Sequence, residues 1–341
     1  MLQTAGHKVP SDSKSLPGHI AQLLATNEKE LQAVERTIEH AFRSGAPLLT
    51  EISSYLLKLG GKRIRPILTL TSSRLFCSNP SNEVVVAAAG IELIHMATLL
   101  HDDIIDESPT RRHHPSAYQK FGTPPSLLAG DFLLARSFGL CAQLDDFVIQ
   151  STETACVELT EGEIAEGHLD PSKPQSLDDY FWVIRRKTAS LFGLATAVGA
   201  HLSGAGDANM ERMRDFGYNA GIAFQVVDDI LDVTADEDLL GKPCGTDLKQ
   251  KTPSIINILW LASGDPEAHR FFATPTPTES ESREAAHQLR QSPIVDEARR
   301  IAERYAENAR KALSEIAHDS IDTAVRQDLI SLVDFTLERC Q

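Results

Sequence analysis

Two copies of one acidic pattern, DDxxD, constrain this chain more than any other feature of its sequence. They are formed by Asp102, Asp103 and Asp106 and by Asp228, Asp229 and Asp232. Each copy lies in an apolar, helix-forming stretch, so its carboxylates project from one side of a helix. Like charges at this spacing destabilise a helix by about 0.2–0.5 kcal/mol per pair. Such an arrangement calls for a cation, and hard oxygen ligands suit Mg²⁺ whose shell is completed by water and phosphate.

The residues before both copies are too apolar for surface helices with a charged outer face. GIELIHMATLLH precedes the first copy, and GIAFQVV precedes the second. Buried carboxylates in such surroundings require partners. We therefore interpret the pair as two halves of a clamp for a diphosphate. The halves can act together only if their helices face each other, as helices do in a bundle.

Composition predicts an all-α fold. The 341 residues are 42% hydrophobic, 24% charged and 6% aromatic. Most segments are rich in Ala, Leu and Glu. Alternating β-branched residues are scarce, and no boundary separates two cores. We expect residues 1–16 to form a flexible lead. Residues 17–341 are expected to form a single all-helical catalytic domain, a bundle around a central apolar cavity.

Clusters of Gly, Pro, Ser and Asn predict the breaks between helices. A further polar tract, TPTPTESES at residues 274–282, is expected to form an extended surface loop because it has little to bury. The breaks fall at residues 45–47, 77–82, 108–125, 170–176 and 204–208.

The net charge of −15 argues against nucleic acid or an anionic membrane surface as the main partner, because both would repel the protein. The five cysteines form no CxxC pair and follow no secretory leader, so we expect reduced thiols and a cytoplasmic location. No apolar run approaches the roughly 18 residues needed to span a bilayer, and we expect no transmembrane segment.

A diphosphate ligand also needs fixed positive charge, and the chain carries basic residues in three groups. Arginine offers a planar fork that matches phosphate oxygens, and glycine frees the backbone beside it. The groups are Lys62, Arg63 and Arg65 in the segment GGKRIRP, the pair Arg111 and Arg112, and Lys187 with Lys242 and Lys251.

As a set, these segments resemble the trans-isoprenyl diphosphate synthases of the polyprenyl synthetase family. The resemblance runs from Glu51 to Arg339 and rests on both DDxxD motifs together with GGKRIRP, the arginine pair, KT, FQVVDDILD and GKPCGTDL. It implies an isoprenoid synthase fold and a homodimer. It also implies a prenyltransferase that condenses isopentenyl diphosphate head-to-tail (1′-4) with an allylic diphosphate.

The resemblance implies a role for each matching residue, with about three Mg²⁺ ions bound together with the substrate. The metal ligands would be Asp102, Asp103, Asp106, Asp228, Asp229 and Asp232. The allylic diphosphate would be bound by Arg111, Lys187, Thr188, Gln225, Lys242 and Lys251. The isopentenyl diphosphate would be bound by Lys62, Arg65, His95 and Arg112. Residues central to catalysis would be Asp102, Asp103, Asp106, Lys187, Asp228 and Asp229.

The chain departs from the family pattern at two places. Where the family commonly has a glutamine in a GExxQ segment, this chain has Glu166 in GEIAE. The loop after Asp247 is also short. The first departure affects one polar contact with the substrate, and the second affects the assignment of Lys251.

Helix geometry predicts the product length, because one turn rises about 5.4 Å, close to the length of an isoprene unit. In the family, bulky aromatics four or five positions before the first motif shorten the product, but here Thr98 and Ala97 are small. Ideal helical steps place Thr98 near the carboxylate face and turn Ala97 away, so the role of Ala97 rests on the resemblance. Ile94, one turn further down, could narrow the tunnel. We predict a product of about four isoprene units or more, with a longer polyprenyl chain preferred.

Four alternatives remain open. A class I terpene cyclase would need no second diphosphate site, so GGKRIRP, His95 and Arg112 argue for the synthase. A synthase could also stop at geranylgeranyl length. A catalytically silent regulatory subunit would show degraded acidic motifs, whereas both are intact. A generic helical scaffold would leave the six aspartates unexplained.

Overall fold

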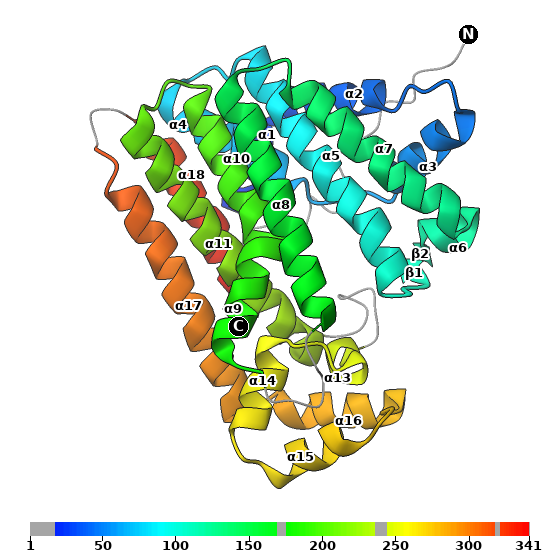
Figure 1. The fold of residues 1–341 in the computed structure, drawn as a ribbon. Coiled ribbons are helices and arrows are strands. Elements are labelled where there is room, and N and C mark those ends of the chain that lie inside the picture. Colours follow the sequence, from blue (N-terminus) through cyan, green and yellow to red (C-terminus); the bar gives the residue numbers. More distant parts are fainter. Residues whose placement is uncertain (1–17, 169–174, 236–243, 318–320, 341) are drawn as a thin grey trace.

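The computed structural model describes residues 18–168, 175–235, 244–317 and 321–340, and this part of the chain is almost entirely helical (Figure 1). The first half contains α1 (Gly18–Thr26), α2 (Glu28–Ala41), α3 (Pro47–Lys58), α4 (Ile64–Phe76), α5 (Asn82–Ile105), β1 (Thr110–Arg111), β2 (His114–Pro115), α6 (Ala117–Phe121), α7 (Thr123–Cys141) and α8 (Asp146–His168). The second half contains α9 (Leu177–Ile184), the π-helix η2 (Arg185–Ala189), α10 (Ser190–His201), α11 (Asp207–Thr234), α13 (Thr246–Gln250), α14 (Ile255–Ala262), α15 (Pro266–Ala273), α16 (Glu279–Leu289), α17 (Pro293–Ser314) and α18 (Thr323–Glu338). The predicted flexible lead lies outside the described residues.

Most helix boundaries follow from local sequence signals. Pro47 opens α3, where its missing N–H and fixed φ are tolerated. The hydroxyl of Ser81 accepts a hydrogen bond from the backbone N–H of Val84 and caps α5. The predicted break at residues 108–125 is not a simple loop, because it contains the β1–β2 hairpin and the short helix α6.

The polar tract at residues 274–282 is a loop only in its first part. α16 begins at Glu279 and is capped by Thr278, whose hydroxyl accepts a hydrogen bond from the N–H of Glu281 at 3.2 Å. The Glu281 carboxylate accepts in return from the backbone N–H of Thr278 at 2.7 Å. This capping box pairs N–H groups that a helix start leaves open. The prediction of an extended loop through residue 282 is therefore wrong.

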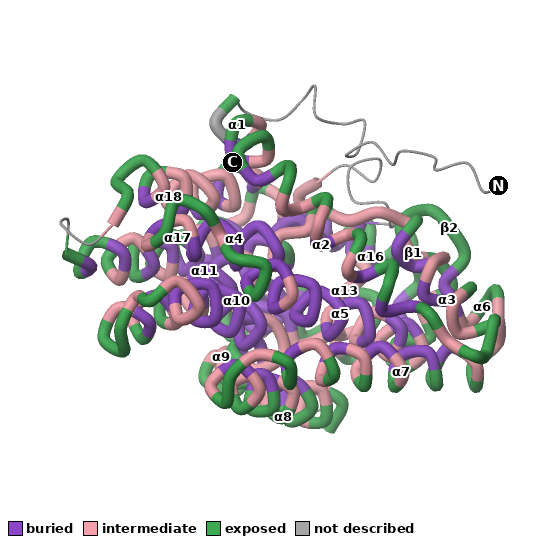
Figure 2. The backbone as a smooth tube through the Cα atoms, turned by 90° about the horizontal axis from the view of Figure 1, so that it is seen from above, coloured by how far each residue is buried: buried purple, intermediate pink, exposed green. Residues whose placement is uncertain are grey.

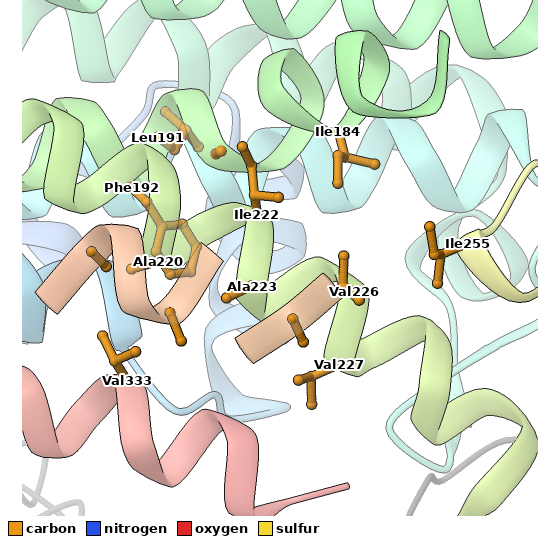
Figure 3. Packing of buried hydrophobic residues seen from close by; sticks show 14 of the residues in the cluster. Ile184, Leu191, Phe192, Ala220, Ile222, Ala223, Val226, Val227, Ile255 and Val333 are labelled. Carbon is orange, nitrogen blue, oxygen red and sulfur yellow. The ribbon is translucent and has the colours of Figure 1, made fainter. Parts of the chain in front are cut away.

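The core is built around the long helices α5 and α11. α11 packs along α10 and α17, whereas α5 packs on α7 and α4. Figure 3 shows buried side chains of one apolar cluster, among them Phe192 of α10 and Ala220 and Ala223 of α11. A second apolar cluster lies beneath α2 and α3, and α5 contributes side chains to both clusters. The burial map in Figure 2 places the most buried backbone along α5, α10 and α11.

The expectation that no segment is apolar enough to span a bilayer is wrong for α5. This helix contains an 18-residue window with a mean hydropathy of 1.7 and passes the test of length and composition. However, 72% of the window is buried inside the protein. A core helix passes the same test, so the finding is weak support for a membrane span.

The C-terminal ends of α5 and α11 lie toward the same end of the bundle. Both helices descend in Figure 1 toward the end of the bundle where α13, α14, α15 and α16 gather. Each helix carries one acidic motif at that end. The fold therefore places the two acidic motifs, which lie far apart in the sequence, toward one end of the bundle.

Candidate functional site

Both acidic motifs lie at the C-terminal ends of long helices. Asp102 and Asp103 occupy the last turn of α5, and Asp106 follows as its C-cap. The second motif lies in the last two turns of α11, which ends at Thr234. The C-terminal end of a helix carries about half a negative charge, so aspartates there are unfavourable on their own. Both helix ends therefore favour a bound cation.

The middle aspartate of the first motif is buried and ion-paired. Asp103 is 1% exposed, and both of its oxygens lie 2.9 Å from Nε of Arg111. The β1–β2 hairpin presents Arg111, and two left-handed residues, Arg112 and His113, close its turn. Asp103 thus orients an arginine, and its carboxylate is engaged within the protein.

Asp102 and Asp106 lie in crowded acidic surroundings. Burial raises the pKa of Asp102 to about 7; Lys187 opposes this shift, whereas Glu163 and Asp106 add to it. Burial also raises the pKa of Asp106, and again Lys187 opposes the shift and Glu163 adds to it. Carboxylates crowded in this way gain stability from an added cation.

Asp229 in the second motif is held by neutral donors. Its Oδ1 accepts a hydrogen bond from Nε2 of Gln225 at 2.9 Å. Its Oδ2 accepts from the hydroxyl of Tyr180 at 2.8 Å and from the backbone N–H of Ile255 at 3.0 Å. Burial raises the pKa of Asp229 to about 7, although these hydrogen bonds oppose the shift. The bonds engage both oxygens and fix the end of α11.

The other two aspartates of this motif differ in exposure. Asp232 is buried and accepts a hydrogen bond from the backbone N–H of Asp247 at 3.0 Å. The side chain of Asp228 is 52% exposed, and its Oδ1 lies 3.6 Å from Nη2 of Arg339. Asp228 is therefore accessible to a ligand, whereas Asp232 anchors the segment that follows α11.

The π-helix η2 connects the two motifs. π-Helical turns are rare and occur frequently at functional sites. Here, Oγ1 of Thr188 donates a hydrogen bond to Gln225 at 2.8 Å, and Gln225 in turn donates to Asp229. The neighbouring Lys187 acts electrostatically on Asp102 in the first motif. A single helical turn thus links the two predicted triplets.

Several predicted cations lie close enough to repel one another. Burial lowers the pKa of Lys62; Arg339 and Arg112 lower it further, whereas Asp228 opposes the shift. Burial lowers the pKa of Arg65 to about 10. Nε of Arg65 is also buried and has no hydrogen-bond partner within the described part of the chain. This crowding favours a multivalent anion as the ligand.

His95 belongs to the same group. Burial, together with the positive charges of Arg65 and Arg112, holds the pKa of His95 well below its ordinary value. The imidazole is therefore neutral at physiological pH, so one of its nitrogens donates a hydrogen bond and the other accepts one. This state suits a directed contact with a ligand rather than an added charge.

A buried ion pair holds the glycine-rich segment that carries Lys62 and Arg65. Arg63, at a left-handed φ of 50°, donates Nε to Glu35 at 2.6 Å and Nη1 to Glu92 at 3.2 Å. Breaking a buried pair by removing one partner costs about 3–5 kcal/mol. We infer that Arg63 fixes this loop, so that its two neighbouring cations can face a ligand.

Of two further predicted ligands of the allylic diphosphate, one is not described and the other is bonded within the protein. Lys242 falls outside the described residues. Nζ of Lys251 donates hydrogen bonds to the carbonyl oxygens of Phe272 at 3.0 Å and Thr274 at 2.6 Å. A contact between Lys251 and a diphosphate would require both bonds to break.

The residues predicted to set product length face different parts of the core. Ile94 and Ala97 are fully buried, and Thr98 is half-buried. Ile94 packs in the cluster around α10 and α11, whereas Ala97 packs in the cluster beneath α2 and α3. The turning of Ala97 away from the carboxylate face, expected from helical steps, agrees with this packing.

Sequence reasoning missed four residues that contact the predicted set. Only Glu166 was visible beforehand, as a departure from the family pattern. The others lack a local signal because their partners lie far away in the sequence. Glu163 and Glu166 bind Lys187. Tyr180 donates a hydrogen bond to Asp229, and Arg339 pairs with Asp228.

Comparisons with known proteins all match this chain to one protein family. Residues 46–291 match the family model described as polyprenyl synthetase. The chain is 34% identical over 309 residues to the nonaprenyl diphosphate synthase of Mycobacterium tuberculosis, covering 90% of this chain and 91% of the relative. It is 32% identical over 320 residues to the geranylgeranyl diphosphate synthase of Sulfolobus acidocaldarius, covering 91% and 96%.

The fold also matches solved structures. A polyprenyl synthase from Caulobacter crescentus CB15, crystallised with calcium and isoprenyl diphosphate, aligns with a TM-score of 0.87 and 31% identity. The alignment covers 94% of this chain and 98% of the other. The similarity therefore extends over nearly the whole of both chains.

Proposed function

This chain belongs to the polyprenyl synthetase family and is a trans-prenyltransferase, and we propose that it joins isopentenyl diphosphate to an allylic diphosphate between its two acidic motifs. One observation carries the proposal: two carboxylate clusters and a crowded group of cations meet at one end of the bundle. Asp228 acts electrostatically on Lys62, and Asp102 acts on Arg65. The carboxylates suit a metal-bound diphosphate, and the cations suit a second diphosphate without metal.

We propose Mg²⁺ as the cofactor, held by Asp102, Asp106 and Asp228. Among the described residues, no three acidic, His or Cys side chains converge closely enough to hold a metal ion alone. A shell completed by diphosphate oxygens and water fits this arrangement and suits Mg²⁺. Bound there, the metal would stabilise negative charge on the departing diphosphate. The calcium in the related Caulobacter synthase supports a divalent cation.

The remaining aspartates would act indirectly. Asp103 orients Arg111, and Asp229 holds the amide of Gln225. In this proposal Arg111, Gln225 and the π-helical pair Lys187–Thr188 bind the allylic diphosphate and stabilise its charge as the C–O bond breaks. The buried walls formed by α5, α10 and α11 would keep water from the allylic cation.

The second substrate would be held by the crowded cations. Lys62, Arg65 and Arg112, with neutral His95, would bind the diphosphate of isopentenyl diphosphate and place its double bond beside the allylic cation. Such positioning converts a collision between two molecules into a step within one complex. The proton lost after addition would pass to the departing diphosphate, so no Ser, Cys or His nucleophile is required.

We include Arg339 in the isopentenyl diphosphate site. Its guanidinium lies near both Lys62 and Asp228, and it stacks over Phe224 with 5.5 Å between Cζ and the ring centroid. Arg339→Gln should raise KM for isopentenyl diphosphate about 10- to 100-fold, since a charge-assisted contact contributes about 1.5–3 kcal/mol. KM for the allylic substrate should change much less. Steady-state kinetics with each substrate varied in turn measure both values.

A matched control separates this effect from a general loss of positive charge. Arg300 is 71% exposed and pairs with Glu297 on the same helix at 2.8 Å. Arg300→Gln should leave both KM values close to those of the unmodified chain. An equal rise of both KM values in Arg339→Gln would instead place Arg339 outside the isopentenyl diphosphate site.

We propose that the protein is a homodimer joined through the α7–α8 face. Leu127 and Leu128 on α7 and Val157 and Ile164 on α8 are exposed by 45–59%. Figure 2 places α7 and α8 together at one edge of the molecule. A hollow of about 570 Å³, lined by Ile164 of α8 and Trp182 of α9, lies between these two helices. Exposed apolar patches of this kind mark interfaces, and a second copy is the occupant we propose.

The dimer can be tested by sedimentation. The unmodified chain should sediment at twice its mass of 37.3 kDa. Replacement of Leu128 and Ile164 with Glu should yield monomers, because charged groups at the centre of an interface are strongly unfavourable. Dimers that persist in this double variant would move the interface to another face.

The proposed partners are the two diphosphates and a second copy of the chain, in the cytoplasm. The net charge of −15 disfavours binding to nucleic acid.

Product analysis tests the function. The purified protein is incubated with Mg²⁺, labelled isopentenyl diphosphate and each allylic starter in turn, and the products are sized. We expect incorporation that requires a starter and Mg²⁺, with products of about four isoprene units or more. No incorporation with any starter would remove the proposal, and products ending at geranyl or farnesyl length would contradict the argument from Ala97 and Thr98.

A further inference from the structure

Two carboxylates of α8 hold the ammonium group of Lys187. Nζ of Lys187 lies 2.8 Å from Oε2 of Glu163 and forms a second, shorter ion pair with Glu166. All three side chains are about one quarter exposed. The ammonium is thus enclosed by protein carboxylates on the side that faces α8.

A glycine brings α8 and the π-helix η2 close enough for these bonds. A Cβ atom at Gly162 would lie 2.9 Å from the backbone N of Lys187 and 3.0 Å from Cβ of Arg186. Only glycine permits this approach without a shift of the backbone. Glu163 and Glu166 are three residues apart, so they share the helix face that meets Lys187.

The ammonium of Lys187 therefore interacts with several negative groups at once. Burial would lower the pKa of Lys187, but Glu166, Glu163 and Asp102 outweigh burial and raise it above its ordinary value. Glu166 also contributes to the raised pKa of Asp106. A diphosphate that approaches Lys187 must compete with carboxylates that already hold it.

We propose that Glu166 is a positioning residue that holds Lys187 in a resting orientation, and that the allylic diphosphate displaces Glu166 from Lys187 when it binds. The inference rests on the proposed function, because it takes Lys187 to be a ligand of the allylic diphosphate. Glu163 keeps a second bond to the ammonium, so displacement of Glu166 does not release Lys187 completely. Glu166 thereby lowers the affinity for the allylic substrate.

The sign of this effect separates the proposal from the opposite role. A carboxylate beside Asp102 and Asp106 could instead add an oxygen ligand for the metal. Removal of its charge would then weaken binding of the metal-bound diphosphate. Under our proposal, removal of the same charge strengthens binding, because Lys187 no longer has to leave an ion pair.

Glu166→Gln provides the test, because an amide of the same shape cannot form the ion pair. We expect KM for the allylic substrate to fall about 3- to 10-fold, the change expected when a partly exposed ion pair no longer competes with the substrate. We expect kcat and KM for isopentenyl diphosphate to change by less than about twofold. Glu166 is displaced when the allylic substrate binds, before the C–O bond breaks, so its removal should affect that binding step and not the chemical step. Calorimetry with an unreactive allylic thiolodiphosphate and Mg²⁺ should show the same gain in affinity without turnover.

Two further variants sharpen the result. Glu161 lies on the same helix and pairs with Arg186 at 3.3 Å, so Glu161→Gln makes the same change in net charge beside a different cation. This control should leave KM for the allylic substrate unchanged. Glu166→Asp keeps the charge on a shorter side chain and should give an intermediate KM.

Each outcome has a defined reading. An unchanged or raised KM in Glu166→Gln, or an equal fall in Glu161→Gln, would overturn the role of Glu166. If the unmodified protein incorporates no isopentenyl diphosphate with any starter, the proposed function fails instead. Normal turnover by the unmodified protein together with an unchanged Glu166→Gln variant would refute only the inference about Glu166.

Discussion

Replacement of Asp102 or of Asp228 with asparagine is expected to lower kcat by about 10²–10³-fold at saturating Mg²⁺, the usual effect of removing one group that stabilises charge in the transition state. Both residues begin their motifs, and both are more exposed than Asp103 and Asp229. Asparagine keeps the shape of the side chain but removes the charge that would bind the metal. Single-turnover assays with labelled substrate measure the chemical step directly.

Asp232→Asn is the matched control for the second motif. The carboxylate of Asp232 is buried and accepts a hydrogen bond from the backbone of Asp247, so we assign it to structure. We expect a clearly smaller loss of kcat, accompanied by a lower free energy of unfolding. If Asp228→Asn keeps kcat near that of the unmodified enzyme, or if Asp232→Asn proves the more damaging change, the division between metal-binding and structural aspartates is wrong.

Phenylalanine at both positions 97 and 98 is expected to shorten the product to about three isoprene units or fewer, because one helical turn corresponds to nearly one unit. Thr98 is half-buried one turn before Asp102, and Ala97 is enclosed by apolar side chains. A ring at position 98, near the carboxylate face, would close the space below the diphosphate, and the contribution expected from a ring at position 97 rests on the family resemblance. Chromatography of the dephosphorylated products measures the chain length.

Leu93→Phe controls for overpacking. Leu93 is fully buried on α5 in the same apolar cluster as Ala97, and helical steps place it opposite Asp102. Overpacking there should cost about 1–3 kcal/mol of stability without shortening the product. Unaltered product length in the 97/98 double variant would show that another helix sets the limit.

The fold was largely predictable because its signals are local. Apolar periodicity, Pro47 and the Gly, Pro and Ser clusters predicted an all-helical chain with most of its breaks. The loop expected at residues 274–282 was wrong because the capping box formed by Thr278 and Glu281 was overlooked. The β1–β2 hairpin escaped prediction because each strand has only two residues, too few for a periodic pattern.

The site was predictable only in its outline. The repeated motifs and the basic segments predicted a set of carboxylates and cations, but sequence spacing could not divide each motif into exposed and buried members. That division depends on partners from other helices, such as Arg111 for Asp103 and Tyr180 for Asp229. Likewise, the ion pair between Glu166 and Lys187 depends on the close packing of α8 against η2, which no local pattern encodes.

The most direct test of the central claim is a crystal structure with Mn²⁺ in place of Mg²⁺ and an unreactive allylic thiolodiphosphate. Anomalous scattering locates the metal independently of the protein. We predict metal peaks that bridge the diphosphate to Asp102 and Asp106 on one side and to Asp228 on the other. A diphosphate bound away from both motifs, or metal peaks that contact neither, would contradict the account.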